Sequence, residues 1–252
     1  MFEERLNLDE YNTNIGHVTR YKFVAQFVSD KIVLDVACGC GYGSNLLIES
    51  NSSEVFGIDI DPQVIKEAQQ SKDNHSRTPE YLVGNAERIP FPDLTVDVVV
   101  CFETLEHVND DKRTIDEIHR VLKQGGILIL TTPNAKITQP KNGVPNNPFH
   151  VREYTPEELT GLLSSQFNEI LLLGQRVRGT VSQRNSPKII RRFLDFFPSE
   201  LRQKLPHFLP PSLADWIVRR VTNHSFYLRE EDIEIEDWGV EKSPVLIAVC
   251  KK

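Results

Sequence analysis

The chain has 252 residues, of which 39% are hydrophobic and 26% are charged, and these are ordinary values for one globular domain with an elaboration. Its formal net charge of −7 argues against a general nucleic-acid binder, because contact with phosphates needs a basic surface. The sequence shows no apolar run long enough to span a membrane and no secretory signal, so we expect a cytoplasmic protein.

Strands and helices alternate through the first half of the chain. The expected strands lie at about 31–37, 54–59, 80–84, 96–101 and 127–131, and the expected helices at about 17–29, 43–50, 62–71 and 110–123. Asp61 is the expected N-cap of the third helix, and Gln124-Gly125-Gly126 is expected to end the fourth. This alternation predicts a parallel sheet with helices on both faces.

The second half of the chain begins with a long loop over residues 133–150, and such loops are usually functional. Thr155 and Glu158 predict a helix start with a capping box. Two further strands are expected at about 167–173 and 244–250. Between them, residues 184–222 combine basic and apolar side chains and predict helices broken by prolines.

The four cysteines follow no zinc-binding spacing. They are Cys38, Cys40, Cys101 and Cys250. We interpret them as reduced thiols and expect no metal.

A glycine-rich turn follows the first strand, in the segment Asp35-Val36-Ala37-Cys38-Gly39-Cys40-Gly41-Tyr42-Gly43. Turns of this kind let the backbone lie against a ligand. A carboxylate at the mouth of the turn would repel a pyrophosphate, so Asp35 favours a ligand that presents a cation or hydroxyls. Asp59 ends the second strand, where an acid can accept hydrogen bonds from a ribose diol.

Four segments in order complete a recognisable pattern: VLDVACGCGYG, VFGIDIDPQVIKEAQ, YLVGNAERIPFPDLTVDVVVCFETLEHV and HRVLKQGGILILTTPN. They cover roughly residues 30 to 135, and the series resembles the motifs of class I S-adenosylmethionine-dependent methyltransferases of the small-molecule type. The segment around His150 resembles those of polysaccharide and secondary-metabolite pathways.

The resemblance implies an α/β fold, a Rossmann-like seven-stranded mostly parallel sheet with helices on both faces and an antiparallel last strand. It implies one domain over residues 1–252, with an N-terminal cap over 1–29 and a helical insertion over about 180–230. S-adenosylmethionine is the implied cofactor, with S-adenosylhomocysteine as the product and no metal.

The same resemblance assigns the cofactor site residue by residue. The implied cofactor-binding residues are Arg20, Asp35, Ala37, Cys38, Gly39, Gly41, Asp59, Ile60, Asn85, Ala86, Cys101 and Glu103. Asp35 is expected to contact the amino group of the cofactor directly or through water, and Arg20 its carboxylate. Ala37 stands where the family more often has glycine, and an alanine fits there if its φ stays negative. Asn85 replaces a frequent aspartate and can still accept from the adenine amine through its carbonyl oxygen.

His107 and His150 are the candidate catalytic bases, because a histidine titrates near neutrality and can take a hydroxyl proton. The alternative for His107 is that it orients its loop by hydrogen bonding. For the segment around His150 the alternatives are that Arg152 holds a substrate anion, or that the segment is a purely structural loop. Arg20 has an alternative role in a surface salt bridge.

Three interpretations of the insertion stay open: a lid over the acceptor pocket, a dimer interface, and a peripheral membrane contact. The partners we expect are a small-molecule acceptor and no nucleic acid, with the chain a monomer or homodimer. The leading hypothesis is methyl transfer to a hydroxyl of a sugar, glycan precursor or secondary metabolite. The alternatives are a protein or RNA methyltransferase, a non-catalytic S-adenosylmethionine-binding protein and a nicotinamide-dependent oxidoreductase.

Overall fold

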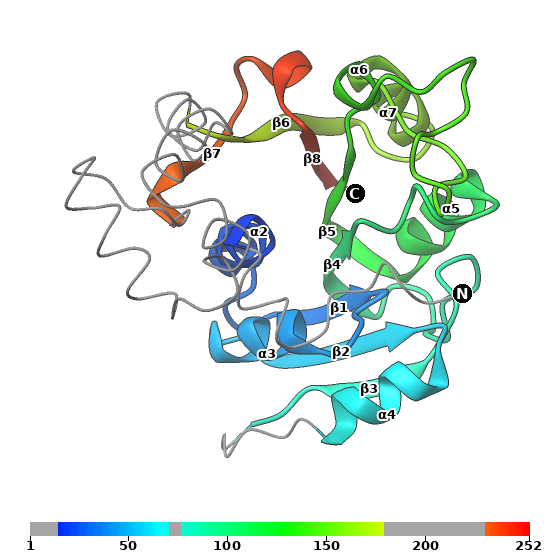
Figure 1. The fold of residues 1–252 in the computed structure, drawn as a ribbon. Coiled ribbons are helices and arrows are strands. Elements are labelled where there is room, and N and C mark those ends of the chain that lie inside the picture. The colour runs from blue at the N-terminus through cyan, green and yellow to red at the C-terminus, as the bar shows by residue number, and fades with distance from the viewer. Residues whose placement is uncertain (1–14, 71–76, 179–229) are drawn as a thin grey trace, which may run out of the picture. The chain divides into compact units, whose positions relative to one another are not determined.

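The computed structural model describes residues 15–70, 77–178 and 230–252 (Figure 1). The chain divides into two compact units, Met1–Arg176 with Ile235–Lys252, and Val177–Glu234. Most of the second unit, and with it the insertion expected over about 180–230, lies outside the described residues.

A mixed sheet forms the centre of the fold, with the strand order β3-β2-β1-β4-β5-β8-β6-β7. Its strands are β1 (Ile32–Val36), β2 (Glu54–Asp59), β3 (Glu80–Val83), β4 (Val96–Phe102), β5 (Leu122–Pro133), β6 (Glu169–Val177), β7 (Ile233–Glu236) and β8 (Val245–Lys251). The first five run parallel, and β8 runs antiparallel between β5 and β6. The mostly parallel sheet with an antiparallel last strand is confirmed, whereas the expected seven strands are eight because β7 is added.

Helices cover both faces of this sheet, as predicted (Figure 1). They are α2 (Ile15–Val24), α3 (Tyr42–Glu49), α4 (Pro62–Gln70), α5 (Asp111–Val121), α6 (Ala135–Thr138) and α7 (Pro156–Leu163), with short 3-10 helices at Ala25–Phe27, Glu230–Asp232 and Val240–Lys242. In the described part of the chain, no helix is both long and apolar enough to cross a bilayer.

Alternate residues of the central strands point to opposite faces, which gives two hydrophobic clusters. Leu34 of β1 belongs to the cluster that packs against α5 and α7. Its neighbour Val33 belongs to the cluster on the other face, against α2 and α3. Both residues are fully buried. The near-continuous apolar runs of β1 and β4 are explained by this coverage on both sides.

The end of α5 differs from the prediction. The helix stops at Val121, and Leu122 already has an extended backbone (φ −66°, ψ 134°) and pairs with Val96 of β4. Gly125 and Gly126 therefore lie inside β5 rather than at a helix end, and Gly125 adopts a φ of +74°. The backbone groups of this segment bond to Lys252, through the N–H of Gly125 and the carbonyl of Gly126.

Packing leaves no room for a side chain at position 43. A pair of glycine-to-alanine substitutions tests this. A Cβ at Gly43 would lie 2.0 Å from Cζ of the buried Tyr21 ring, whereas nothing lies within 4 Å of a Cβ at Gly161 in α7. Alanine in a helix is more stable than glycine by about 0.5–1 kcal/mol, but overpacking a core costs about 1–3 kcal/mol.

Gly43→Ala should therefore lower the free energy of unfolding by about 1–2 kcal/mol, while Gly161→Ala should raise it by a few tenths to about 1 kcal/mol. Urea denaturation of both variants beside the wild type measures the two changes. Equal effects of the two substitutions would contradict the tight contact between Tyr21 and α3.

Candidate active site

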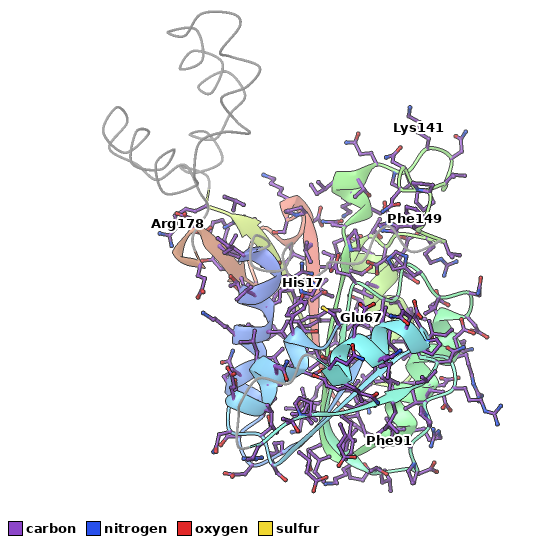
Figure 2. All side chains as sticks on the ribbon, turned by 60° about the horizontal axis from the view of Figure 1, so that its bottom comes forward. His17, Glu67, Phe91, Lys141, Phe149 and Arg178 are labelled. Carbon is purple, nitrogen blue, oxygen red and sulfur yellow. The ribbon has the colours of Figure 1, made fainter. Side chains whose placement is uncertain are left out.

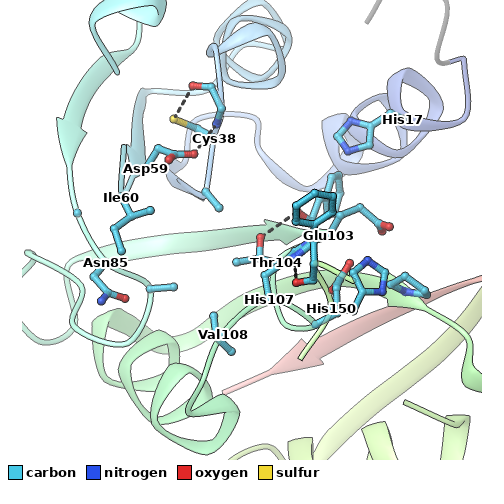
Figure 3. A pocket seen from close by; sticks show the side chains of 18 of the residues that line it. His17, Cys38, Asp59, Ile60, Asn85, Glu103, Thr104, His107, Val108 and His150 are labelled. Atoms are coloured by element: carbon cyan, nitrogen blue, oxygen red, sulfur yellow. Dashed lines mark hydrogen bonds between the residues drawn. The ribbon is translucent and has the colours of Figure 1, made fainter. Parts of the chain in front are cut away.

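A cavity of about 710 Å³ opens at the carboxyl ends of the parallel strands (Figure 3). Its walls come from the residues that follow β1, β2, β3 and β4, from α2, and from the loop that precedes α7. Ligands of open α/β sheets bind at this edge. Eleven of the fourteen predicted site residues line the cavity: Arg20, Ala37, Cys38, Gly39, Asp59, Ile60, Asn85, Ala86, Glu103, His107 and His150.

The glycine-rich turn after β1 forms the first wall of the cavity. Its backbone is held by the N–H of Cys38, which donates to the carbonyl of Ile58 at 2.9 Å. Ala37 has a φ of +57°, so the condition that its φ stays negative is not met. A left-handed alanine costs about 1–2 kcal/mol, and such strain gathers at functional sites. Gly39 and Gly41 also have positive φ values, where glycine carries no such cost.

Asp59 and Ile60 form the second wall at the end of β2 (Figure 3). The Asp59 side chain is oriented by two backbone groups: Gly39 N–H donates to Oδ2 at 3.1 Å and Asp61 N–H donates to Oδ1 at 3.0 Å. Asp59 is only 3% exposed, whereas the next residue, Ile60, is 61% exposed. A fixed carboxylate beside an exposed apolar side chain fits a ribose next to a flat base.

Asn85 and Ala86 follow β3 and face the same cavity. The Oδ1 atom of Asn85 already accepts a hydrogen bond from the N–H of Glu87 at 2.8 Å. A carbonyl oxygen has a second lone pair, so its expected contact with an adenine amine stays a prediction.

Asp35, Gly41 and Cys101 do not line the cavity. Gly41 accepts a hydrogen bond from the Tyr81 hydroxyl at 2.9 Å, and Cys101 is a fully buried residue of the core below the site. Burial also raises the pKa of the Cys101 thiol to about 12. All four cysteines are buried free thiols.

The Asp35 carboxyl is fully buried beneath the turn. Ser44 donates to it at 2.7 Å and Tyr21 at 3.2 Å. Burial raises the pKa of Asp35 to about 7; the two hydrogen bonds oppose this shift, and the nearby Asp59 carboxylate adds to it. A direct contact with a ligand does not fit this geometry, which instead makes Asp35 a group that ties α2 and α3 to β1.

Arg20 of α2 is buried and paired within the protein. Its Nη1 donates to Oε1 of Glu103 at 2.5 Å and to the hydroxyl of Thr131 at 3.1 Å. Burial opposes ionisation of Glu103, but Arg20 and Thr131 outweigh it and hold the pKa of Glu103 below its usual range. The alternative of a surface salt bridge is wrong, because Arg20 is only 6% exposed. Its contact with a cofactor carboxylate stays a prediction.

Aromatic rings complete the wall that α2 forms. The ring of Tyr21 packs edge-on against those of Tyr42 and Phe102, and His17 contacts the hydroxyl of Tyr42 through Nδ1. Burial, with a smaller contribution from Arg20, lowers the pKa of His17 to about 3. His17 is therefore neutral at physiological pH and is not a cation for a ligand.

His107 and His150 lie side by side at the far end of the cavity, with ring centroids 4.9 Å apart (Figure 3). His150 is carried by the loop between α6 and α7, which Lys141 and Phe149 mark in Figure 2. The Nδ1 of His107 lies 3.1 Å from the Phe149 carbonyl, and the Nδ1 of His150 lies 2.7 Å from Oε1 of the buried Glu153. Both partners only accept, so the Nδ1 atoms carry the protons and the Nε2 atoms carry lone pairs.

Arg152 is not among the residues that line the cavity. It forms an ion pair with Asp111 and is 59% exposed at its side chain. The interpretation of Arg152 as an anion-binding residue is therefore not supported by its position.

Glu106 is the site residue that the sequence analysis missed. It is 1% exposed, it lines the cavity, and its Oε2 accepts a hydrogen bond from Thr132 at 2.9 Å. Burial raises the pKa of Glu106 well above its usual range, and the charge of Glu103 adds to this. One carboxylate oxygen of Glu106 and one ring nitrogen from each of His107 and His150 all lie within 4.8 Å of one another. The signal was present in the run Glu103-Thr104-Leu105-Glu106-His107, which places two carboxylates and a histidine after one strand.

A family model described as a methyltransferase domain matches residues 34–130. A probable S-adenosylmethionine-dependent methyltransferase of Mycolicibacterium smegmatis is 35% identical over 156 residues, which are 61% of this chain and 58% of that protein. A second one, from Mycobacterium tuberculosis, is 35% identical over 161 residues, 63% of this chain and 56% of that protein. The chain thus spans little more than half the length of these curated relatives.

Among solved structures, one from Thermotoga maritima has the same fold. It is described as an S-adenosylmethionine-dependent methyltransferase and possible histamine N-methyltransferase. The TM-score is 0.60 at 16% identity, with 97% of this chain and 95% of that chain covered. At this identity the similarity concerns the fold alone.

Proposed function

We propose, from the premise that this chain carries a class I S-adenosylmethionine-dependent methyltransferase domain, that it transfers a methyl group from S-adenosylmethionine to a hydroxyl of a small molecule. The observation that carries the proposal is one cavity with two chemically different ends. One end has the Asp59 carboxylate beside the exposed Ile60, and the other has the pair His107 and His150.

The residues at the first end fit the cofactor. Asp59 would accept from both ribose hydroxyls, and Ile60 would lie against the adenine face. The backbone of Ala37 and Gly39 lines the cavity where the methionyl part would run. S-adenosylmethionine supplies an electrophilic methyl carbon bonded to a sulfonium, so the protein has to orient the acceptor rather than create the reactive group.

The histidine end suits an acceptor hydroxyl. Glu153 accepts a hydrogen bond from Nδ1 of His150 at 2.7 Å, so the Nε2 atom carries the lone pair that would take a proton once the Asn147 amide, 3.0 Å away, turns aside. As the acceptor oxygen forms its bond to the methyl carbon, the bond from that carbon to the sulfonium sulfur would break and S-adenosylhomocysteine would leave. The acceptor proton would pass to Nε2 and then to water. His107 would position the same oxygen. A hydroxyl of a sugar, glycan precursor or secondary metabolite is the proposed acceptor, in accord with the resemblance around His150 and with a cavity of about 710 Å³.

The test is transfer of a radiolabelled methyl group from S-adenosylmethionine to a panel of sugar, glycan-precursor and phenolic acceptors. With a productive acceptor, His150→Gln should lower kcat by about a hundredfold and leave the KM for S-adenosylmethionine within about twofold, since the imidazole acts on the acceptor. His119→Gln is the matched control, because His119 lies on α5 and does not line the cavity.

Equal kcat values for the wild type and His150→Gln would contradict the role of His150. Absence of transfer to every hydroxyl acceptor, with transfer to amines instead, would contradict the choice of oxygen.

A further inference from the structure

We propose that Glu106, His107 and His150 form a binding site for one divalent transition-metal ion. One carboxylate oxygen and one ring nitrogen from each histidine lie within 4.8 Å of one another, a separation that small side-chain rotations would close to bonding distance around a single ion. Two imidazoles and one carboxylate form the donor set that binds first-row divalent metals at a site with open coordination positions. This proposal departs from the prediction of no metal, which rested on the cysteines and the family resemblance.

The first independent observation is the orphaned oxygen of Glu106. Among the described residues, Oε1 of Glu106 is a buried side-chain oxygen with no hydrogen-bond partner, while Oε2 is held by Thr132. A buried acceptor without a partner costs about 1–3 kcal/mol, and more when it is charged. Because the side chain is only 1% exposed and lines the cavity, an ion at the cavity wall would satisfy this oxygen.

The second observation concerns the hydrogen bonds that the Nδ1 atoms of the two histidines make. Metal-binding histidines usually donate their other ring N–H to a backbone carbonyl or a carboxylate, which fixes the tautomer. His107 donates from Nδ1 to the Phe149 carbonyl, and His150 donates from Nδ1 to Glu153. Both rings therefore carry the Nε2 lone pair that a metal requires. The amide of Asn147, 3.0 Å from Nε2 of His150, occupies the place of the ion and would turn aside on binding.

The open positions of such an ion would face the cavity that receives the acceptor. On the proposed function, the acceptor oxygen would bind the ion, which would lower the pKa of its hydroxyl as metals do for bound water. In the metal-bound form His150 would be a ligand of the ion rather than the base, and the acceptor proton would pass directly to water. Ion binding itself rests only on the three side chains and can be tested without cofactor or acceptor.

The experiment is a titration of the chelator-treated full chain with Co²⁺, followed by calorimetry and by visible absorption. The wild type should bind one equivalent at this site and show ligand-field bands without thiolate-to-cobalt charge transfer, because the ligands are nitrogen and oxygen. Glu106→Gln and His107→Gln should each weaken binding at least about tenfold. Glu153→Gln, which changes the carboxylate that accepts from Nδ1 of His150 and from the Thr138 hydroxyl, should weaken it by about 10–100-fold.

His119→Gln is the matched control and should bind Co²⁺ like the wild type. Circular dichroism and binding of S-adenosylhomocysteine show that each variant is folded, since the cofactor end of the cavity does not use these residues. Equal affinity of Glu106→Gln and wild type, thiolate charge-transfer bands, or no saturable binding by the wild type would overturn the proposal. Intact Co²⁺ binding without methyl transfer to any acceptor would instead contradict the proposed function.

Discussion

Asp59→Ala should weaken binding of S-adenosylhomocysteine by roughly a thousandfold. The carboxylate is positioned by the N–H groups of Gly39 and Asp61, so it would accept from two ribose hydroxyls without reorganisation. Each hydrogen bond to a charged group contributes about 1.5–3 kcal/mol, and the loss of two corresponds to a factor of about 10²–10⁴ in Kd, with a thousandfold near the middle. Isothermal titration calorimetry of the purified variant measures the change.

Two control variants distinguish the loss of a ligand contact from a distortion of the loop after β2. Asp59→Asn keeps one side-chain oxygen, so its Kd for S-adenosylhomocysteine should fall between those of the wild type and Asp59→Ala. Asp61→Asn changes the neighbouring acid, whose side chain accepts from the Gln63 N–H at the start of α4, and should alter the Kd by no more than about twofold, the size of a surface effect. Unchanged binding by folded Asp59→Ala would remove Asp59 from the site.

Asp35→Asn should become more stable relative to the wild type as the pH rises. The pKa of Asp35 is raised to about 7 in the folded protein, against about 3.9 in an unfolded chain. The native state therefore keeps a proton that the unfolded state releases. The stability that this protonation contributes is complete below about pH 4 and is lost as the pH rises through about 7.

Between about pH 5 and pH 8 the difference in unfolding free energy between Asp35→Asn and the wild type should shift by about 3 kcal/mol in favour of the variant. Urea denaturation at the two pH values measures it. A pH-independent destabilisation of Asp35→Asn is expected in addition. Tyr21 and Ser44 both donate to the carboxyl, whereas an amide offers only one oxygen. Asp30→Asn, an exposed position, is the control. A pH-independent difference would show that Asp35 is already ionised in the folded protein near pH 5.

Local patterns in the sequence were enough to predict most elements of the fold. The capping box of Thr155 and Glu158 and the cap of α4 by Asp61 are confirmed, because these bonds join residues two or three apart. The end of α5 was predicted wrongly. Gly125-Gly126 indicated a helix end, but pairing of Leu122 with Val96 overrides that local preference. The short edge strand β7 was not predicted, although its residues Ile233–Glu236 alternate between isoleucine and glutamate as strands do.

In the candidate site, too, local features could be predicted from the sequence and long-range contacts could not. Residues at strand ends were predictable because parallel strands bring their carboxyl ends to one edge of a sheet. Three features of the site could not be predicted from the sequence. They are the positive φ of Ala37, the burial of Asp35 beside Tyr21 and Ser44, and the ion pair of Arg20 with Glu103. Each depends on packing between segments distant in the sequence, which a motif does not encode.

The measurement that tests the account most directly is a calorimetric titration of the wild-type chain with S-adenosylhomocysteine, beside an identical titration with NADH. We expect saturable, one-to-one binding of S-adenosylhomocysteine in the micromolar range and no binding of NADH, since residues 34–130 match a methyltransferase domain. Binding of NADH without S-adenosylhomocysteine would contradict the assignment of the cavity to S-adenosylmethionine.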